Sequence, residues 1–154
     1  MNCTFLDALG GRETEYLIAR ALQFFAPGIP QVYYVGLLGG RNDMELLARS
    51  GVGRDINRHY YQPAEIKSAL ARPFAQRLLE LIRVRNAHPA FGGEMSLNVP
   101  TEHVIEITWA LDNSWIKLLV DLSVPEASIT GTSMPPLIIE EDVASEAQSK
   151  GLLK

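Results

Sequence analysis

The ten residues PGIPQVYYVG, at positions 27–36, decide the fold class of this chain. Their uncharged centre, residues 31–35, predicts a short strand that is apolar on both faces, as in a buried parallel sheet. The preceding residues 13–26 predict a helix, because Leu17, Ala21, Leu22 and Phe25 fall on one helical face. A helix followed by a buried strand indicates an α/β arrangement for the first half of the chain.

The residues after this stretch continue the same pattern. Residues 36–61 form a long connection with a helical turn or two at 43–49, and connections of this length are usually functional. Residues 63–70 predict a helix. A third helix starts at Pro73, which suits a first-turn position, and closes at His88 and Pro89.

The second half of the chain alternates short β-type runs with turn residues. Residues 103–109 and 115–122 each place apolar side chains on one face, with a turn at 112–114 between them. This pattern predicts an antiparallel hairpin with one buried side. Residues 128–130 and 137–139 predict further short strands, and the polar residues from 140 onward are expected to fray.

Composition and charge exclude several classes of protein. The chain has 154 residues, a net charge of -4 and 47% hydrophobic residues, which is ordinary for a globular protein. It has no basic surface for nucleic acid or an anionic membrane, no signal peptide, and no apolar run long enough to span a bilayer. The lone cysteine, Cys3, rules out an intrachain disulfide, so we expect a cytoplasmic protein.

Cofactor and metal motifs are not expected in this sequence. The glycine-rich residues 36–40 lack the Gly-Lys-Ser/Thr ending of a phosphate-binding loop. His59, His88 and His103 fall on different predicted elements, which disfavours a metal site. We therefore predict no cofactor and no metal site.

Two stretches carry a resemblance to a known family. Residues 27–36 resemble the last barrel strand of α-amylase-type glycoside hydrolases. Residues 53–61, GRDINRHYY, together with NDMELL at 42–47, resemble the loop that follows this strand in sucrose phosphorylases and their close relatives. The resemblance is gapless from Asn2 to about Asn86 and weaker from Phe91 to Val120. The sequence motifs show none from Ser123 onward.

The resemblance implies a fold and a division into domains. Residues 1–88 would be the last strand and helices of a (β/α)₈ TIM barrel, residues 89–139 a small antiparallel β domain, and residues 140–154 a polar tail. A complete barrel needs roughly 250 residues. We therefore expect an incomplete barrel, and thus a C-terminal fragment, with an apolar strand at 31–35 that has lost neighbours and invites aggregation.

The resemblance also implies a reaction. Members of the family are retaining transferases that move a glucosyl unit from sucrose to inorganic phosphate and form α-glucose 1-phosphate. This chemistry requires two carboxylates about 5 Å apart, one ionised and one protonated. In the family these residues come from earlier barrel strands, so we expect this chain to carry no catalytic residue. The donor stays open among sucrose, sucrose 6-phosphate and glucosylglycerate, and so does the oligomeric state, with a homodimer included.

One substrate-binding residue of the family maps onto the chain, and it is Arg54. A guanidinium offers several fixed donors to vicinal hydroxyls and keeps its charge. Gly51 and Gly53 would give the backbone the freedom that a binding loop needs. The alternative reading of Arg54 is a surface arginine paired with Asp55 or Asp43.

Other candidate residues also have plainer structural readings. The run Arg58-His59-Tyr60-Tyr61 mixes basic and aromatic side chains, and we interpret it as loop packing rather than nucleic-acid contact. We interpret Asp43, Glu45 and Asp55 as loop caps and ion-pair partners. Two tryptophans, Trp109 and Trp115, could form a sugar-stacking platform, but large aromatics on a hairpin are more often core.

Two hypotheses from different classes follow. The first is a fragment of a glycoside phosphorylase that is inactive alone. The second is a non-catalytic module that binds or complements a separate polypeptide carrying the rest of the barrel. An unrelated α+β domain is a third reading, which the joint presence of the two motifs at the expected separation disfavours.

Overall fold

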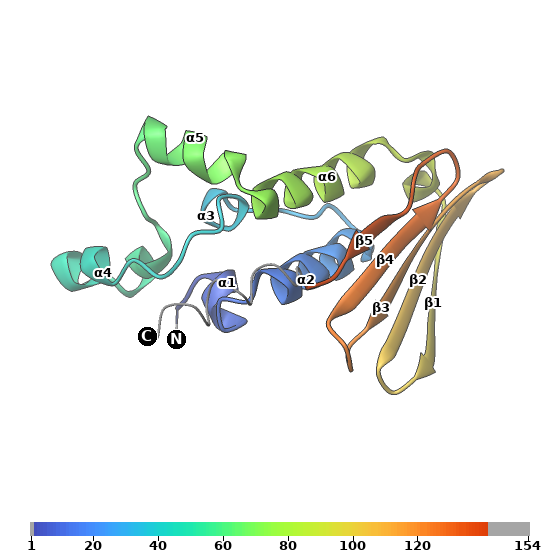
Figure 1. Ribbon diagram of the computed structural model, residues 1–154, viewed down its shortest axis with the longest axis horizontal. Helices are drawn as coiled ribbons and strands as arrows, with labels where there is room; N and C mark the ends of the chain where they lie inside the picture. Colours follow the sequence, from blue (N-terminus) through green and yellow to red (C-terminus); the bar gives the residue numbers. More distant parts are fainter. Residues whose placement is uncertain (1, 142–154) are drawn as a thin grey trace, which may run out of the picture. The chain divides into compact units, whose positions relative to one another are not determined.

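The computed structural model describes residues 2–141, which divide into two compact units at residues 2–88 and 89–141. The first is helical, and the second, over its described residues, is a sheet preceded by one short 3₁₀ turn (Figure 1). The predicted small antiparallel β domain after the helices of the first part is confirmed.

The helices of the first unit start and stop where local chemistry dictates. They are α1 (Phe5–Ala8), α2 (Glu13–Phe25), α3 (Tyr34–Leu37), α4 (Met44–Ser50), the 3₁₀ helix η1 (Gly53–Asn57), α5 (Pro63–Ala71) and α6 (Pro73–Ala87). The Thr4 side chain caps α1, and Asp43 caps α4. A proline occupies the first turn of both α5 and α6, where the missing N–H costs nothing. The predicted helices at 13–26, 43–49, 63–70 and 73–88 are confirmed within two residues.

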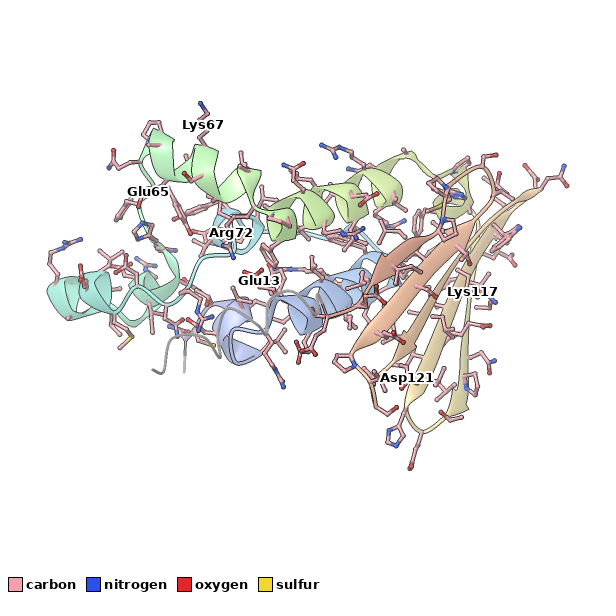
Figure 2. All side chains as sticks on the ribbon, viewed as in Figure 1. Glu13, Glu65, Lys67, Arg72, Lys117 and Asp121 are labelled. Atoms are coloured by element: carbon pink, nitrogen blue, oxygen red, sulfur yellow. The ribbon has the colours of Figure 1, made fainter. Side chains whose placement is uncertain are left out.

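The core of the first unit forms where α2 lies beside α6 (Figure 1). Tyr16 of α2 is fully buried and stacks at 5.2 Å between ring centroids on both Phe5 and Phe74. An ion pair between Glu13 and Arg72 joins the start of α2 to the residue between α5 and α6 (Figure 2). Apolar burial along the two helices therefore holds this unit together, with the ion pair at its surface.

The predicted strand at residues 31–35 is wrong for this structure. Residues 31–33 form no strand, and Tyr34–Leu37 form the single helical turn α3. A strand is stable only when its backbone groups pair with a neighbour. Within residues 2–88 no other strand is present to supply one. The backbone instead closes local bonds, such as Leu37 N–H to the Tyr33 carbonyl at 2.9 Å.

The second unit is a meander of five antiparallel strands. After the 3₁₀ helix η2 (Pro89–Gly92) come β1 (Glu94–Thr101), β2 (Val104–Leu111), β3 (Ser114–Asp121), β4 (Glu126–Gly131) and β5 (Leu137–Ile139). They pair in sequence order, β1 to β5, as Figure 1 shows. The predicted hairpin corresponds to β2 and β3, joined by a two-residue turn in which Asp112 has a φ of 51°. The predicted strands at 128–130 and 137–139 are present as β4 and β5.

One face of this sheet is buried and the other is not. Ile107 pairs with Leu118 and Trp109 with Ile116, and all four side chains are buried. Trp115 lies on the opposite face with 42% of its surface exposed. The core reading therefore holds for Trp109 and fails for Trp115. A platform built from both tryptophans does not form: Trp115 pairs with Ala110, the neighbour of Trp109, and successive residues of a strand point to opposite faces of the sheet.

Sequence reasoning missed the edge strand β1. Met95, Leu97 and Val99 alternate with polar residues, and this alternation is a strand signal. Pro100, which lacks an N–H, is tolerated here because β1 is at the edge and its register with β2 shifts between Asn98 and Thr101.

Candidate functional site

Arg54 lies on η1 with its side chain exposed to solvent. The same 3₁₀ helix buries Ile56, so the segment is anchored on one side and open on the other. No hydrogen bond or ion pair within residues 2–141 engages the guanidinium. The alternative reading, in which Arg54 pairs with Asp55 or Asp43, is therefore not what the structure has. A free guanidinium on an anchored segment keeps all its donors available to a ligand.

The two glycines near Arg54 differ in what they contribute. Gly51 ends α4 in the left-handed region with a φ of 66°, a conformation that favours glycine. Gly53 does not have a positive φ, and a Cβ there would meet Asn2 at an ordinary contact distance of 3.6 Å. The expected backbone freedom is thus confirmed at Gly51 only.

Asn42 and Asp43 link the long connection at residues 36–61 to the start of the chain and to η1 by hydrogen bonds. The Asn42 side chain accepts a hydrogen bond from Thr4 N–H at 2.7 Å, and its own N–H donates to Asp7. The Asp43 carboxylate accepts from Leu46 N–H at 2.7 Å and so caps α4, as predicted. Asp43 N–H also donates to the Ile56 carbonyl at 2.7 Å. This last bond joins the start of α4 directly to η1.

His59 stands at the centre of a second set of contacts. Its Nδ1 lies 2.6 Å from Asp43 Oδ2, and its Nε2 lies 3.5 Å from Glu65 Oε1. Its backbone carbonyl accepts a hydrogen bond from the Tyr34 hydroxyl at 3.0 Å. Its ring packs edge-on against Tyr61 at 4.6 Å. His59 thus joins α3, the start of α4 and the start of α5.

Glu65 serves both its helix and His59. Its Oε2 accepts from Gln62 N–H at 2.6 Å, as part of the capping box at the start of α5 (Figure 2 labels Glu65). This cap has a recognisable sequence signal, since Gln62 precedes a helix and a glutamate follows it three residues later. No sequence signal pairs Asp43 with His59, sixteen residues away.

The electrostatics of this cluster follow from those contacts. The hydrogen bond that His59 donates to the Asp43 carboxylate raises the pKa of His59 above its ordinary value of 6.5. The pKa of Asp43 is lowered, chiefly by the Leu46 N–H and then by His59. Partial burial, with the neighbouring Tyr33, raises the pKa of Tyr34 to about 12. Below pH 6.5, the favoured state is therefore a protonated His59 ring that faces two carboxylates, with the Tyr34 hydroxyl protonated.

The loop-packing interpretation of residues 58–61 holds in part. His59 and Tyr61 make the contacts just described, whereas Tyr60 is 71% exposed. The Tyr61 hydroxyl would lie 2.2 Å from a Cβ at Gly40, so this glycine is required for the close approach. The glycines of 36–40 therefore serve packing within the unit.

A cavity of approximately 940 Å³ opens beside the cluster. Its walls come from residues 38–45 and from the α5 region, and they include Arg41, Asp43, His59, Glu65 and Arg72. Arg54 is not among the lining residues. The charges that face the cavity are mostly engaged with one another: Arg41 with Asp7, and Arg72 with Glu13.

The described part of the chain has neither a membrane span nor a metal-binding cluster. None of its helices is long and apolar enough to cross a membrane. Between residues 2 and 141 no group of three histidine, cysteine or acidic side chains is arranged to hold a metal ion.

Comparison with known proteins identifies close relatives. The chain is 54% identical over 132 residues to sucrose phosphorylase from Agrobacterium vitis, which covers 86% of this chain and 27% of the relative. It is 42% identical over 155 residues to sucrose phosphorylase from Bifidobacterium adolescentis, covering 99% of this chain and 30% of the relative. This second match continues past Ser123, where the motifs alone carried no resemblance.

A solved structure shares the fold. The crystal structure of sucrose 6F-phosphate phosphorylase from Thermoanaerobacter thermosaccharolyticum superposes with a TM-score of 0.85 at 42% identity, over 91% of this chain and 29% of that one. No family model matches the chain. The chain thus spans between a quarter and a third of the length of these relatives and matches their C-terminal region. Over that region it belongs to the family of sucrose phosphorylases and related glycoside phosphorylases.

Proposed function

We propose that the chain is part of a retaining glycoside phosphorylase that transfers a glucosyl unit from sucrose, or a close analogue such as its 6-phosphate, to inorganic phosphate. The product would be α-glucose 1-phosphate. The 54% identity to a sucrose phosphorylase carries this proposal. In this assignment residues 1–88 end the catalytic barrel, residues 89–139 form the β domain, and the complete enzyme works in the cytoplasm on donor and phosphate.

Arg54 is the residue through which this region would contact the substrate. Its guanidinium is exposed, has no carboxylate partner within residues 2–141, and is carried by a segment that the Asp43–Ile56 hydrogen bond holds in place. Vicinal sugar hydroxyls match the fixed, parallel donors of a guanidinium. Arg54 would therefore orient the glucosyl ring, while other residues of the complete enzyme break the bond.

The 154-residue chain by itself is proposed to be inactive. Retaining transfer needs two carboxylates about 5 Å apart that are free to attack and to protonate. Two of the three acidic side chains that line the cavity, with Glu45 the third, already have partners: Asp43 contacts His59 and caps α4, and Glu65 caps α5. Asp7 pairs with Arg41. None of these partnered carboxylates is available as a nucleophile.

A second candidate function is a non-catalytic module that complements a separate barrel-bearing polypeptide. One observation favours it. The segment expected to be a barrel strand exposes apolar surface, since Ile29 is 93% and Tyr33 51% exposed. A surface of this kind is suited to covering by further protein.

A chimera tests the proposed function. The whole chain would replace the matching C-terminal region of the Agrobacterium vitis enzyme, to which it is 54% identical over 132 residues. We expect the chimera to release glucose 1-phosphate from sucrose and phosphate, and the isolated 154-residue chain to release none. A folded chimera with no activity on sucrose or its 6-phosphate would contradict the proposal, as would activity of the isolated chain.

Co-expression separates the two candidates. The Agrobacterium vitis enzyme truncated before its matching region would be produced together with the 154-residue chain. Recovery of phosphorolysis in a complex of the two would support the complementing module. If the chimera is active but the two separate chains never associate, the fragment of a single polypeptide is the better description.

A further inference from the structure

We propose that His59 is a positioning residue: a latch that clamps the Arg54-bearing helix η1 between the starts of α4 and α5 by joining the carboxylates of Asp43 and Glu65. The inference concerns how the segment is held. Only its consequence for sugar binding rests on the proposed function of Arg54.

The connectivity carries the argument. η1 lies between Asp43 on its N-terminal side and His59 on its C-terminal side. Asp43 bonds to the segment itself, through its N–H and the Ile56 carbonyl at 2.7 Å. The same residue bonds to the far end of the loop, through Oδ2 and His59 Nδ1 at 2.6 Å. The loop that carries Arg54 is thus closed at its base by Asp43 and His59.

Two more contacts fix the closed loop to the rest of the unit. His59 Nε2 faces Glu65 Oε1 at 3.5 Å, and Glu65 is itself held by Gln62 N–H at the start of α5. The Tyr34 hydroxyl donates to the His59 carbonyl at 3.0 Å. Helices α3, α4 and α5 therefore all meet at one residue, and no other side chain near η1 makes as many cross-links within the described residues.

The chemistry of the ring decides when the latch is complete. An imidazole can donate from both nitrogens only when it is protonated, and both nitrogens here face carboxylate oxygens. The charged groups around the ring are Asp43 from α4, Glu65 from α5 and Arg72 before α6. The nearby phenols are those of Tyr34 and Tyr61. Two acids in direct contact oppose one more distant arginine, so the cationic ring is favoured.

The direction of the pH effect follows. The pKa of His59 is raised, so the latch is complete below pH 6.5, the ordinary value, and weakens as the pH rises through the higher folded pKa. The pKa of Asp43 is lowered, so its contribution is present above pH 3.8 and is lost as the pH falls through the lower folded pKa. The latch therefore holds across mildly acidic to near-neutral pH.

Amide hydrogen exchange on the 154-residue chain tests the latch directly. Asp43 N–H, donated to the Ile56 carbonyl, reports whether η1 is docked. We expect His59→Gln to lower the protection factor of this amide about three- to tenfold, the scale of a partly exposed charge-assisted hydrogen bond. Protection in the unaltered chain should fall as the pH rises above 6.5, and His59→Gln should abolish that dependence.

The matched control is His103→Gln. His103 is an exposed histidine of the second unit that faces Glu102 at 3.2 Å. The His103→Gln substitution should leave both the protection of the Asp43 amide and its pH dependence unchanged. Equal protection of Asp43 in His59→Gln and in the unaltered chain would overturn the latch. A loss of protection throughout residues 2–88 would also overturn it, since it would show a general folding role.

Measuring KM for sucrose in the chimera distinguishes a failure of the latch from a failure of the proposed function. In the chimera, His59→Gln should raise KM for sucrose more at pH 6 than at pH 8, because the latch is already weakened at the higher pH. Lost protection at Asp43 with unchanged kinetics would leave the latch in place and overturn its link to Arg54. An inactive chimera with a normal exchange result would count against the proposed function alone.

Discussion

The two units of this chain differ in where their backbone finds its partners. In the sheet, each strand pairs with its neighbour in sequence, so β1–β5 satisfy one another. In the helical unit the segment expected to be a strand finds no partner within residues 2–88 and coils into α3 instead. The comparison teaches that a pattern becomes structure only where its hydrogen-bonding partners are present.

The two units also differ in the kinds of side chain that they bury and expose. The sheet buries a continuous apolar face and exposes no cluster of opposed charges as dense as that around His59. The helical unit holds the exposed Arg54, the charged cavity and the latch. Hydrogen bonds to distant backbone, together with the buried side chains of Leu46 and Ile56, set the geometry of its long connection.

The largest effect should come from the core of the sheet. Leu118 is fully buried in β3, so Leu118→Ala should lower the free energy of unfolding of the second unit by ~3 kcal/mol, through lost transfer energy and a cavity. Its control is Leu119→Ala, one residue along on the exposed face. Both tryptophans lie in this unit, so their fluorescence during chemical denaturation reports on it. Equal losses of unfolding free energy in the two variants would contradict the assignment of Leu118 to the buried face and Leu119 to the exposed face of the sheet.

An intermediate effect should come from the polar network under α3. The Tyr16 hydroxyl donates to the Gly36 carbonyl at 2.9 Å and accepts from buried Arg20, also at 2.9 Å. Tyr16→Phe should cost the first unit ~1 kcal/mol, because both partners lose a hydrogen bond. The helical signal in far-ultraviolet circular dichroism follows this unit. Exposed Tyr33→Phe is the control, and equal losses of stability in the two variants would contradict the role of this network.

The smallest effect should come from the hairpin turn. Asp112 has a φ of 51° and sits between the paired residues Leu111 and Ser114. Asp112→Gly should stabilise the sheet by about 0.5 kcal/mol or leave it unchanged, since glycine adopts this conformation without strain. Asp112→Val should destabilise it. If Val were tolerated as well as Gly in a tryptophan-detected melt, the turn conformation would be wrong.

How far the sequence predicts each unit follows from the same contrast. The alternation of Ile107 with Trp109, and of Ile116 with Leu118, needs only neighbouring strands to become a core, and these positions were predictable. The same holds for helix ends marked by Pro63 and Pro73. The strand predicted at 31–35 required neighbouring strands, which no local pattern supplies, and this prediction was wrong.

The candidate site divides in a similar way. Arg54 could be identified from its motif, and the cap at Asp43 from its residue type. The meeting of Asp43 with His59, and of both with Glu65 and Tyr34, could not, because it depends on how a connection of more than twenty residues folds back on itself. Tertiary contacts at that separation leave no periodic signal in a single sequence.

The central claim is that Arg54 grips a glucosyl ring, and kinetics of the chimera test it most directly. Arg54→Gln should lower kcat/KM for sucrose about 100-fold, the loss expected when a charged donor to the substrate is removed. Arg77→Gln, which removes an exposed arginine paired only with Glu80 on α6, should leave kcat/KM unchanged. Equal values for the two variants would contradict the claim.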